Sequence, residues 1–488
     1  MTRETHSSES PLTEHTDLPP VVTPAERAAV GKAARKLVPR STCADFSVAS
    51  DRPDPIDLLL EQAVTREPDL IPIRHSRMAV SPFTFFRGAA LPMAADLASM
   101  PNSGLRVQLC GDAHLLNFGI FGTPERRLVF DINDFDETSP GPFEWDILRL
   151  SASLVLAARE RGDKPAYINS LVMGTVAAYR ESMASFAQMS NLDVWYSLFD
   201  IEQLATELGA SLPAHADAFS ARSMRKVRSR NSVMAAERLT ETVDGELRFV
   251  ANAPLQVPDP TIIESLYSYS LGHVHTNAEL YRRSLSPERQ YLFDDYRIVD
   301  SARRVVGVGS VGTRCYILLL LGRDSKDPLI LQVKEAQPSV LERFAGKGAY
   351  SNHGERVVVG QKLTQSASDL FLGWTTLMLP EAGNRYFYLR QFRDWKASID
   401  YTMLKGDGFL YYAQLCAWAL AKAHARSGDQ IAISAYLGNS NVFDKAVLDF
   451  SLAYADQTVI DHQSLIDAIA SGRVTAESGA GGAGDSHA

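Results

Sequence analysis

Residues 110–137 read CGDAHLLNFGIFGTPERRLVFDINDFDE, and this stretch decides the fold that we expect for the chain. Two apolar, β-prone runs at 118–121 and 128–132 flank a turn-forming Gly-Thr-Pro-Glu segment, so the pattern predicts a hairpin. A short alternating run at 107–109 predicts a further strand just before it. The hairpin therefore joins two loops, GDAHLLN and INDFDE, and both loops carry acidic side chains.

The composition is that of an ordinary globular protein. The 49 Lys and Arg residues against 58 Asp and Glu residues give a formal net charge of −9, so nucleic acid is an unlikely partner. Hydrophobic residues make up 45% of the chain, enough for a large core, yet no apolar run approaches the roughly 20 residues of a membrane-spanning helix. The four cysteines are far apart in apolar segments, which favours buried thiols and a cytoplasmic protein.

The hydrophobic periodicity divides the chain into five parts. The polar residues 1–23 and the Gly/Ala/Ser-rich residues 474–488 predict disordered tails. Residues 24–297 show mainly helical spacing around the hairpin and predict a large helical lobe. The β-rich runs within 298–400 predict a small β lobe, and residues 401–473 return to helical spacing and are expected to rejoin the large lobe.

The two hairpin loops contain the residue types that phosphoryl transfer requires. Asp112 and Asn117 stand five positions apart, a spacing at which an acid orients or deprotonates an acceptor hydroxyl while an amide binds a metal that bridges phosphates. Residues 131–137, which include the second loop, hold four acids within seven positions, and packed carboxylates repel one another unless a cation is bound. Asp134, with Asp136 nearby, is therefore the best candidate for a magnesium ligand. Either loop alone could instead cap turns and helices.

A glycine-rich turn and a lysine follow about two hundred residues later. Gly307, Gly309 and Gly312 lie between strand-like runs, and Lys334 ends the next run. Glycine lets backbone amides approach phosphates closely, and the segment lacks the helix and the downstream acid of a dinucleotide-binding fold. The order of strand, glycine turn, strand and lysine thus predicts a nucleotide-binding sheet. The alternative is a tight hairpin with a lysine in solvent.

Other residues are weaker candidates. Glu355 could pair with Lys334 and aim it at phosphate. The cations of segment 390–396 follow a strand, and we expect them to face solvent rather than phosphate. His424 lies on an apolar helix face, which favours a hydrogen-bonded core histidine over a catalytic one. The basic run at 222–230 has no interleaved aromatics and predicts a solvated helix face.

The two loops resemble the catalytic and metal loops of aminoglycoside-phosphotransferase-type and protein-kinase-like enzymes. CGDAHLLN is similar to their His-Gly-Asp-x-His-x-x-Asn pattern, with Cys110 in place of the usual histidine. DFD, followed by Gly-Pro and Trp-Asp, resembles their metal-binding segment and the acid that opens the next helix. From about residue 51 to 457 the chain more closely resembles the bacterial domain-of-unknown-function family 2252, through RMAVSPFTFFRG, LCGDAHLLNFG, FDINDFDE, VGVGSVGTR, AHARSGD and YADQ.

The resemblance implies an α+β, protein-kinase-like fold of two lobes. In ordinary kinases the glycine loop and lysine precede the catalytic loop, whereas here they follow it, so a circular permutation is expected. The implied activity is an ATP- and Mg²⁺-dependent phosphotransfer to a hydroxyl of a small-molecule acceptor. The implied site residues are Asp112 as catalytic acid/base, Asn117, Asp134 and Asp136 at magnesium, and Gly307, Gly309, Gly312 and Lys334 at the nucleotide.

Three other functions remain compatible with the same residues. A non-catalytic module would bind the nucleotide without turnover. A nucleotidyltransferase would use the same site with the nucleotide reversed. A metal-dependent hydrolase would use Asp112, His114, Asp131 and Asp134, and its glycine loop would be incidental. The nucleotide-dependent functions share one spatial requirement, because folding must bring Lys334 within reach of Asp134.

Overall fold

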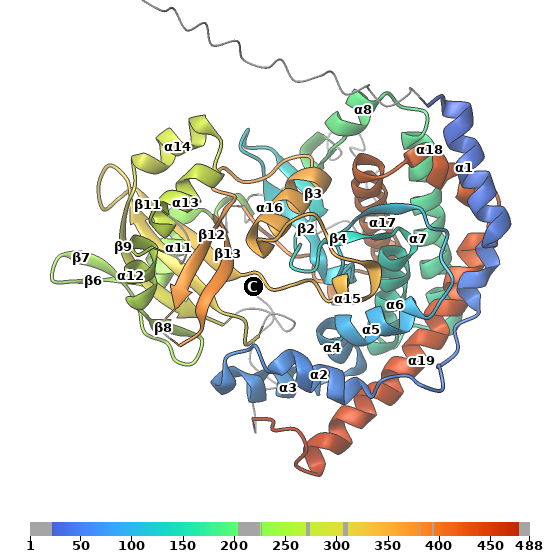
Figure 1. Ribbon diagram of the computed structural model, residues 1–488, viewed down its shortest axis with the longest axis horizontal. Helices are drawn as coiled ribbons and strands as arrows, with labels where there is room; N and C mark the ends of the chain where they lie inside the picture. Colours follow the sequence, from blue (N-terminus) through green and yellow to red (C-terminus); the bar gives the residue numbers. More distant parts are fainter. Residues whose placement is uncertain are drawn as a thin grey trace, which may run out of the picture.

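The computed structural model describes residues 22–203, 225, 227–269, 274–305, 311–379, 381–392 and 395–477. These residues form a mixed α+β protein with four sheets, in which all the paired strands are antiparallel. A six-stranded sheet and the helices that cover it make up one side of the molecule, and long packed helices make up the other (Figure 1). The parts of the predicted tails at 1–21 and 478–488 lie outside the described residues.

Five α-helices come first in the described chain, and the local sequence explains where they begin. They are α1 (Pro24–Leu37), α2 (Pro55–Ala63), α3 (Ile71–Met78), α4 (Pro82–Gly88) and α5 (Ala90–Ala98). Three of them start at a proline that follows a capping side chain, from Thr23, Asp54 and Ser81. Proline suits the first helical position because its missing N–H would have no partner there. Helices α2 to α4 lie below the gap between the sheet and the long helices (Figure 1).

The predicted hairpin is confirmed. β2 (Phe118–Gly122) pairs with β3 (Leu128–Ile132) along the whole length of both strands. The predicted strand before it is β1 (Arg106–Leu109), which pairs with β4 (Ser139–Pro142) beyond the second loop. Both acidic loops therefore lie between the same two pairs of strands, so they are held close together by strand pairing on either side.

Long helices pack behind the hairpin. The central ones are α6 (Glu144–Glu160), α7 (Pro165–Phe186), α17 (Gly408–Ser427) and α19 (Val442–Ala470). They bury a continuous apolar core that also takes in β2 and β3. The shorter helices α8 (Asn191–Tyr196) and α18 (Gln430–Leu437) pack at the edge of this group, and β5 (Phe199–Asp200) adds to β3. Helix α17 comes from late in the chain and packs against α7 and β3.

The late β-rich runs form the centre of the large sheet. The strands are β9 (Arg297–Arg304), β10 (Cys315–Leu321), β11 (Pro328–Glu335), β12 (Gly373–Leu379), β13 (Gly383–Gln391) and β8 (Gln256–Pro258). Their order across the sheet is β12-β13-β11-β10-β9-β8. Every residue of β10 and β11 is buried, as expected for two central strands covered on both faces.

Helices cover both faces of this sheet. Those on or near it are α11 (Ser232–Leu239), α12 (Thr261–Tyr267), α13 (Asn277–Ser284), α14 (Pro287–Asp294) and α16 (His353–Thr364), whereas the short α15 (Glu342–Ala345) contacts α5 and β4. Helix α11 contacts β11 from one side, whereas α12 and α13 contact β12. Helix α16 touches β12, β13 and also α17, so it connects the sheet to the long helices.

Alternation along β11 and β13 sends one set of side chains toward the hairpin. Lys334 is paired in register with Tyr388, and both alternate with Val333 and Leu389, which enter the apolar core that includes α12 and α13. Arg390 follows Tyr388 at a spacing of two and shares its face. The sheet thus presents a row of polar groups at the end nearest the acidic loops.

Three of the strands that the sequence interpretation missed lie between residues 240 and 258. Residues 24–297 were expected to be mainly helical, but β6 (Thr240–Val243) and β7 (Glu246–Phe249) form a hairpin and β8 becomes the edge of the large sheet. Asp244 and Gly245 both have positive φ at the turn. Asp-Gly between short alternating runs is a local hairpin signal, so these strands could have been read from the sequence.

Two other expectations can be compared with the structure. The four cysteines are all unpaired and buried, as predicted. The C-terminal tail was expected from residue 474, but Val474 is buried and the Glu477 N–H donates to Ser76 Oγ at 2.7 Å. Packing therefore continues to the end of the described residues. Within those residues, no helix has the length and apolar character needed to span a bilayer.

A buried ion pair ties the late helix α17 to the early strand β3. Lys422 is 0% exposed and pairs with Asp131, which is 2% exposed. Burial lowers the pKa of Lys422, and the charge of Asp131 acts in the opposite direction. A lysine in this position stays charged only because the carboxylate is beside it.

Lys422→Met should therefore destabilise the protein by about 3–5 kcal/mol, because Asp131 would be left buried without a counter-charge. The free energy of unfolding from urea titration measures this loss. The double variant Asp131→Leu/Lys422→Met should recover most of it, since two apolar groups of similar size need no pairing. Equal stability of the single variant and the unmodified protein would contradict the importance of this pair.

Candidate functional site

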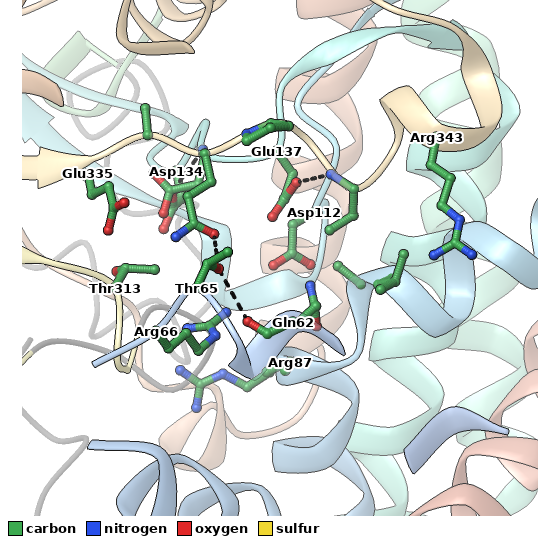
Figure 2. A pocket seen from close by; sticks show the side chains of 18 of the residues that line it. Gln62, Thr65, Arg66, Arg87, Asp112, Asp134, Glu137, Thr313, Glu335 and Arg343 are labelled. Carbon is green, nitrogen blue, oxygen red and sulfur yellow. Dashed lines mark hydrogen bonds between the residues drawn. The ribbon is translucent and has the colours of Figure 1, made fainter. Parts of the chain in front are cut away.

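A cavity of about 320 Å³ opens where the two acidic loops meet the end of β11 and helices α2 and α4. Figure 2 shows Asp112, Asp134 and Glu137 on one side of it and Arg66 and Arg87 on the other. The residues that line it and enter the argument below are Gln62, Arg66, Arg87, Gly88, Asp112, His114, Asn117, Asp134, Asp136, Glu137 and Glu335. Four residues predicted from the sequence, Asp112, Asn117, Asp134 and Asp136, thus share one cavity.

The backbone before Asp112 is held by a buried carboxylate. Asp146, in the first turn of α6, accepts the amide N–H of Cys110 at 2.8 Å and that of Gly111 at 3.1 Å. Gly111 has φ +87°, and a Cβ there would lie 2.1 Å from the carbonyl oxygen of Glu137, so only glycine fits. The same Asp146 contacts His424 Nε2 at 3.2 Å.

His424 is a core histidine, as predicted. Its Nδ1 lies 2.7 Å from the Tyr179 hydroxyl, and the ring is 0% exposed. Its second nitrogen contacts Asp146, so the histidine acts on the loop only through that carboxylate. The hydrogen bonds that link Tyr179, His424 and Asp146 therefore hold the backbone of the first acidic loop in place from the side of the long helices.

The carboxylate of Asp112 points into the cavity with 20% of its side chain exposed. Arg149 Nε donates to its Oδ1 at 2.5 Å, and the Arg149 guanidinium lies 4.3 Å from the centre of the Phe86 ring. His114 Nε2 lies 3.7 Å from Asp112 Oδ2. Burial, together with Arg87 and Arg149, lowers the pKa of His114 to about 4, although the charge of Asp112 opposes this. His114 is therefore neutral at pH 7.

Asn117 joins the first loop to the second. Its side-chain Nδ2 donates to the main-chain carbonyl of Asp112 at 2.6 Å, and the main-chain carbonyl of Asn117 accepts the Asn133 N–H at 2.8 Å. The first bond fixes the amide group, which leaves its oxygen as the remaining polar atom of that side chain. Asn133 immediately precedes Asp134, so the two candidate metal ligands are positioned by one continuous set of hydrogen bonds.

Lys334 reaches the second loop from the sheet. It is 2% exposed, pairs with Asp136, and its Nζ lies 3.8 Å from Asp134 Oδ2. The Tyr388 hydroxyl donates to Asp136 Oδ1 at 2.8 Å. Burial opposes the charged lysine, but the two aspartates raise its pKa above the ordinary value. The expected approach of Lys334 to Asp134 is confirmed, although the two residues are 334 − 134 = 200 positions apart.

The charge of Asp134 is stabilised by three cations. Burial alone would raise its pKa, but Lys334, Arg390 and Lys396 lower it to about 2. Arg390 Nη1 donates to the Asn133 carbonyl at 3.2 Å, and burial together with Arg390 lowers the pKa of Lys396 to about 7. The expectation that the cations of segment 390–396 face solvent is therefore wrong for Arg390 and Lys396. Residues 393 and 394 lie outside the described residues.

The expected pairing of Glu355 with Lys334 is not present. Among the described residues Glu355 forms no ion pair, and Lys334 pairs with the two aspartates instead. The neighbouring Arg356 is the residue of α16 that reaches the site. It donates to the carbonyls of Thr138 at 2.6 Å and Asp136 at 2.8 Å, and so supports the backbone of the second loop.

Only one of the three predicted glycines can be placed. Gly312 has φ +87°, its carbonyl accepts the Glu67 N–H at 2.7 Å, and a Cβ there would lie 3.1 Å from the Cβ of Arg66. Gly307 and Gly309 lie outside the described residues. The described end of the glycine turn thus packs against the chain between α2 and α3.

The oxygen donors of the cavity suit a magnesium ion only in part. In the described ranges, no three His, Cys, Asp or Glu side chains are grouped closely enough to hold a metal by themselves. Asn117 and Asp134 both line the cavity, and Mg²⁺ is commonly bound by one or two protein oxygens with waters and phosphate oxygens completing the shell. Asp136 is already engaged by Lys334 and Tyr388. The donor set therefore fits a magnesium ion that arrives with a phosphate group.

The fold and the cavity define an α+β protein whose acidic loops are backed by buried cations. The model of the family described as "uncharacterized protein conserved in bacteria (DUF2252)" matches residues 66–468, and the chain belongs to this family. The matched range contains Arg66, both acidic loops and Lys334. No curated protein and no solved structure matched the chain.

The lowered pKa of His114 predicts a pH dependence of stability. Between about pH 4 and 6.5 the unfolded chain binds a proton at His114 that the folded protein does not, so stability should fall as the pH falls through this range, by up to about 3 kcal/mol. His114→Gln should flatten this part of the curve of unfolding free energy against pH. Parallel curves for the variant and the unmodified protein would contradict the assignment of this pH dependence to His114.

Proposed function

We propose that the protein is a cytoplasmic ATP- and Mg²⁺-dependent phosphotransferase that acts on a hydroxyl group of a small molecule. The observation that supports this proposal is the placement of Lys334, which comes from the late sheet and pairs with Asp134 and Asp136 beside the cavity that holds Asp112 and Asn117. An acid, an amide, a second acid and a lysine are the parts from which phosphotransferase sites are built.

The proposal also interprets the fold as a circularly permuted protein-kinase-like fold of two lobes. The order β9, glycine turn, β10, β11 with Lys334, α16, β12, β13 and then α17 is that of a small lobe followed by a return to the helical part. The hairpin with both acidic loops precedes all of them. Helix α16 supports the second loop through Arg356, where a glutamate was expected.

In the proposed reaction, Asp112 orients the acceptor hydroxyl and takes up its proton. The bond between the γ-phosphorus of ATP and the bridging oxygen breaks, a bond to the acceptor oxygen forms, and ADP leaves. Arg149 holds Asp112 in place, so the carboxylate contributes mainly by positioning. Lys334 would neutralise phosphate charge, and Asn117 and Asp134 would hold magnesium, which supplies further neutralisation of the phosphates.

One observation weakens the hydrolase alternative. That function needs Asp131, but this residue is 2% exposed, pairs with Lys422 and is absent from the lining of the cavity. Among the described residues, the remaining acids of the two loops do not gather in a group of three that could hold a metal ion. The residues that do line the cavity therefore fit the roles of a phosphotransferase site better than those of a hydrolase site.

Asp112→Asn should reduce transfer of label from γ-labelled ATP by about 10²–10⁴-fold while ATP binding is retained, because the variant loses the proton acceptor but not the nucleotide contacts. Asp324→Asn, a half-exposed aspartate between β10 and β11, is a matched control and should leave turnover unchanged. Equal turnover in the Asp112 variant would remove its assigned role. Transfer of an α-label instead of a γ-label would establish nucleotidyl transfer.

ATP with magnesium should raise the melting temperature of the protein, because a ligand that binds only the folded state stabilises it. Lys334→Met should lose this response. Lys326→Met, which removes an exposed lysine from the turn before β11, should retain it. If ATP stabilises the Lys334 variant as much as the unmodified protein, the nucleotide is not bound at this cavity.

A further inference from the structure

The wall of the cavity opposite Asp112 is cationic. Arg66 follows α2 and Arg87 lies in the last turn of α4, and both line the cavity (Figure 2). Arg74, on α3, stands behind this wall. Its Nη2 donates to the carbonyl of Gly88 at 2.9 Å and lies 3.5 Å from Gln62 Oε1, and both of these partners line the cavity.

Two of these arginines lack the partners that buried charges normally have. Arg74 is 1% exposed, and its Nε and Nη1 are buried with no hydrogen-bond acceptor. Arg66 donates from Nη1 to the Val311 carbonyl at 2.6 Å, but its Nε is buried without an acceptor. Among the described residues neither forms an ion pair. Burial lowers the pKa of Arg66 to about 10, although the charges of Glu137, Asp136 and Glu335 act in the opposite direction, so Arg66 stays charged at pH 7. An unpaired buried cation is costly.

By contrast, two other arginines in the described part of the chain have carboxylate partners. Arg52 lies between Asp96 and Asp461, at 2.7 Å from each, and Arg149 bonds to Asp112. Among the described residues, no carboxylate lies within ion-pair distance of Arg66 or Arg74; the buried Arg426 has none either, but its guanidinium donates to the carbonyls of Leu363 and Trp195. The guanidinium groups of Arg66 and Arg87 that line this wall are complementary to an anionic ligand.

We infer that Arg66 and Arg87, with Arg74 behind them, form a subsite for a phosphate or carboxylate group of the acceptor, which would then be a small hydroxylated anion. Guanidinium groups bind such anions with paired hydrogen bonds. The subsite faces Asp112 across the cavity, so an acceptor held by its anionic end would present a hydroxyl to that carboxylate. The transfer step rests on the proposed function, whereas the binding of the anion does not.

Binding of inorganic phosphate to the full chain, in a chelator and without nucleotide, tests this inference. The unmodified protein should bind phosphate. Arg66→Gln and Arg87→Gln should each weaken phosphate binding at least about tenfold, because each removes one charged guanidinium group. Arg323→Gln, whose side chain is 80% exposed between β10 and β11, is the control and should bind phosphate normally. Circular dichroism establishes that each variant is folded.

Lys334→Met separates this subsite from the nucleotide site. It should lose the response to ATP with magnesium and keep phosphate binding. The inference is overturned if phosphate fails to bind the unmodified protein, if it binds both arginine variants equally well, or if Lys334→Met loses phosphate binding while Arg66→Gln retains it. Phosphate binding that depends on the arginines, in a protein that ATP does not stabilise, would support the subsite and remove the proposed function alone.

Discussion

The pairing of Lys334 with Asp134 and Asp136 is the interaction on which the rest of the site depends. A lysine that is 2% exposed needs carboxylates beside it, and carboxylates gathered in a short loop need a cation. Each requirement is met by the other partner, and the two partners come from opposite sides of the molecule. The sheet is therefore fixed against the hairpin by charge, and the cavity lies where that contact ends.

A second set of contacts holds the N-terminal helices, which line the cavity opposite the acidic loops, against the rest of the molecule. The chain between α2 and α3 meets the sheet through the bond from Arg66 to the Val311 carbonyl and the bond from the Glu67 N–H to the Gly312 carbonyl. Arg314 also pairs with Glu67 at 2.8 Å. Helix α4 meets the long helices through Arg149, which donates to the Phe86 carbonyl at 2.9 Å. The N-terminal helices thus connect both sides of the molecule and supply the cationic wall.

The parts of the site that were predictable are those encoded by local sequence. The hairpin and its loops follow from two apolar, β-prone runs and the turn residues between them, within 28 consecutive positions (137 − 110 + 1 = 28), and Asp112, Asn117 and Asp134 could be named from spacing. Arg390 could have been added, because alternation along β13 places it on the face of Tyr388. Glu355 was chosen in place of Arg356, yet neighbours on a helix point about 100° apart, and only tertiary packing decides which one faces the site. Nothing local marks Arg66 or Arg74, since their role depends on how the chain around α2, α3 and α4 packs at the cavity.

The separation of Lys334 from Asp134 has a consequence for the order of events during synthesis. The acidic loop leaves the ribosome 200 residues (334 − 134) before its lysine, which at the usual rates of about 5–20 residues per second is about 10–40 s. For that interval the nascent hairpin carries its carboxylates without their partner, in contact with water and free cations. A strand made late in synthesis, β11, therefore neutralises a charge that an earlier part of the chain already carries.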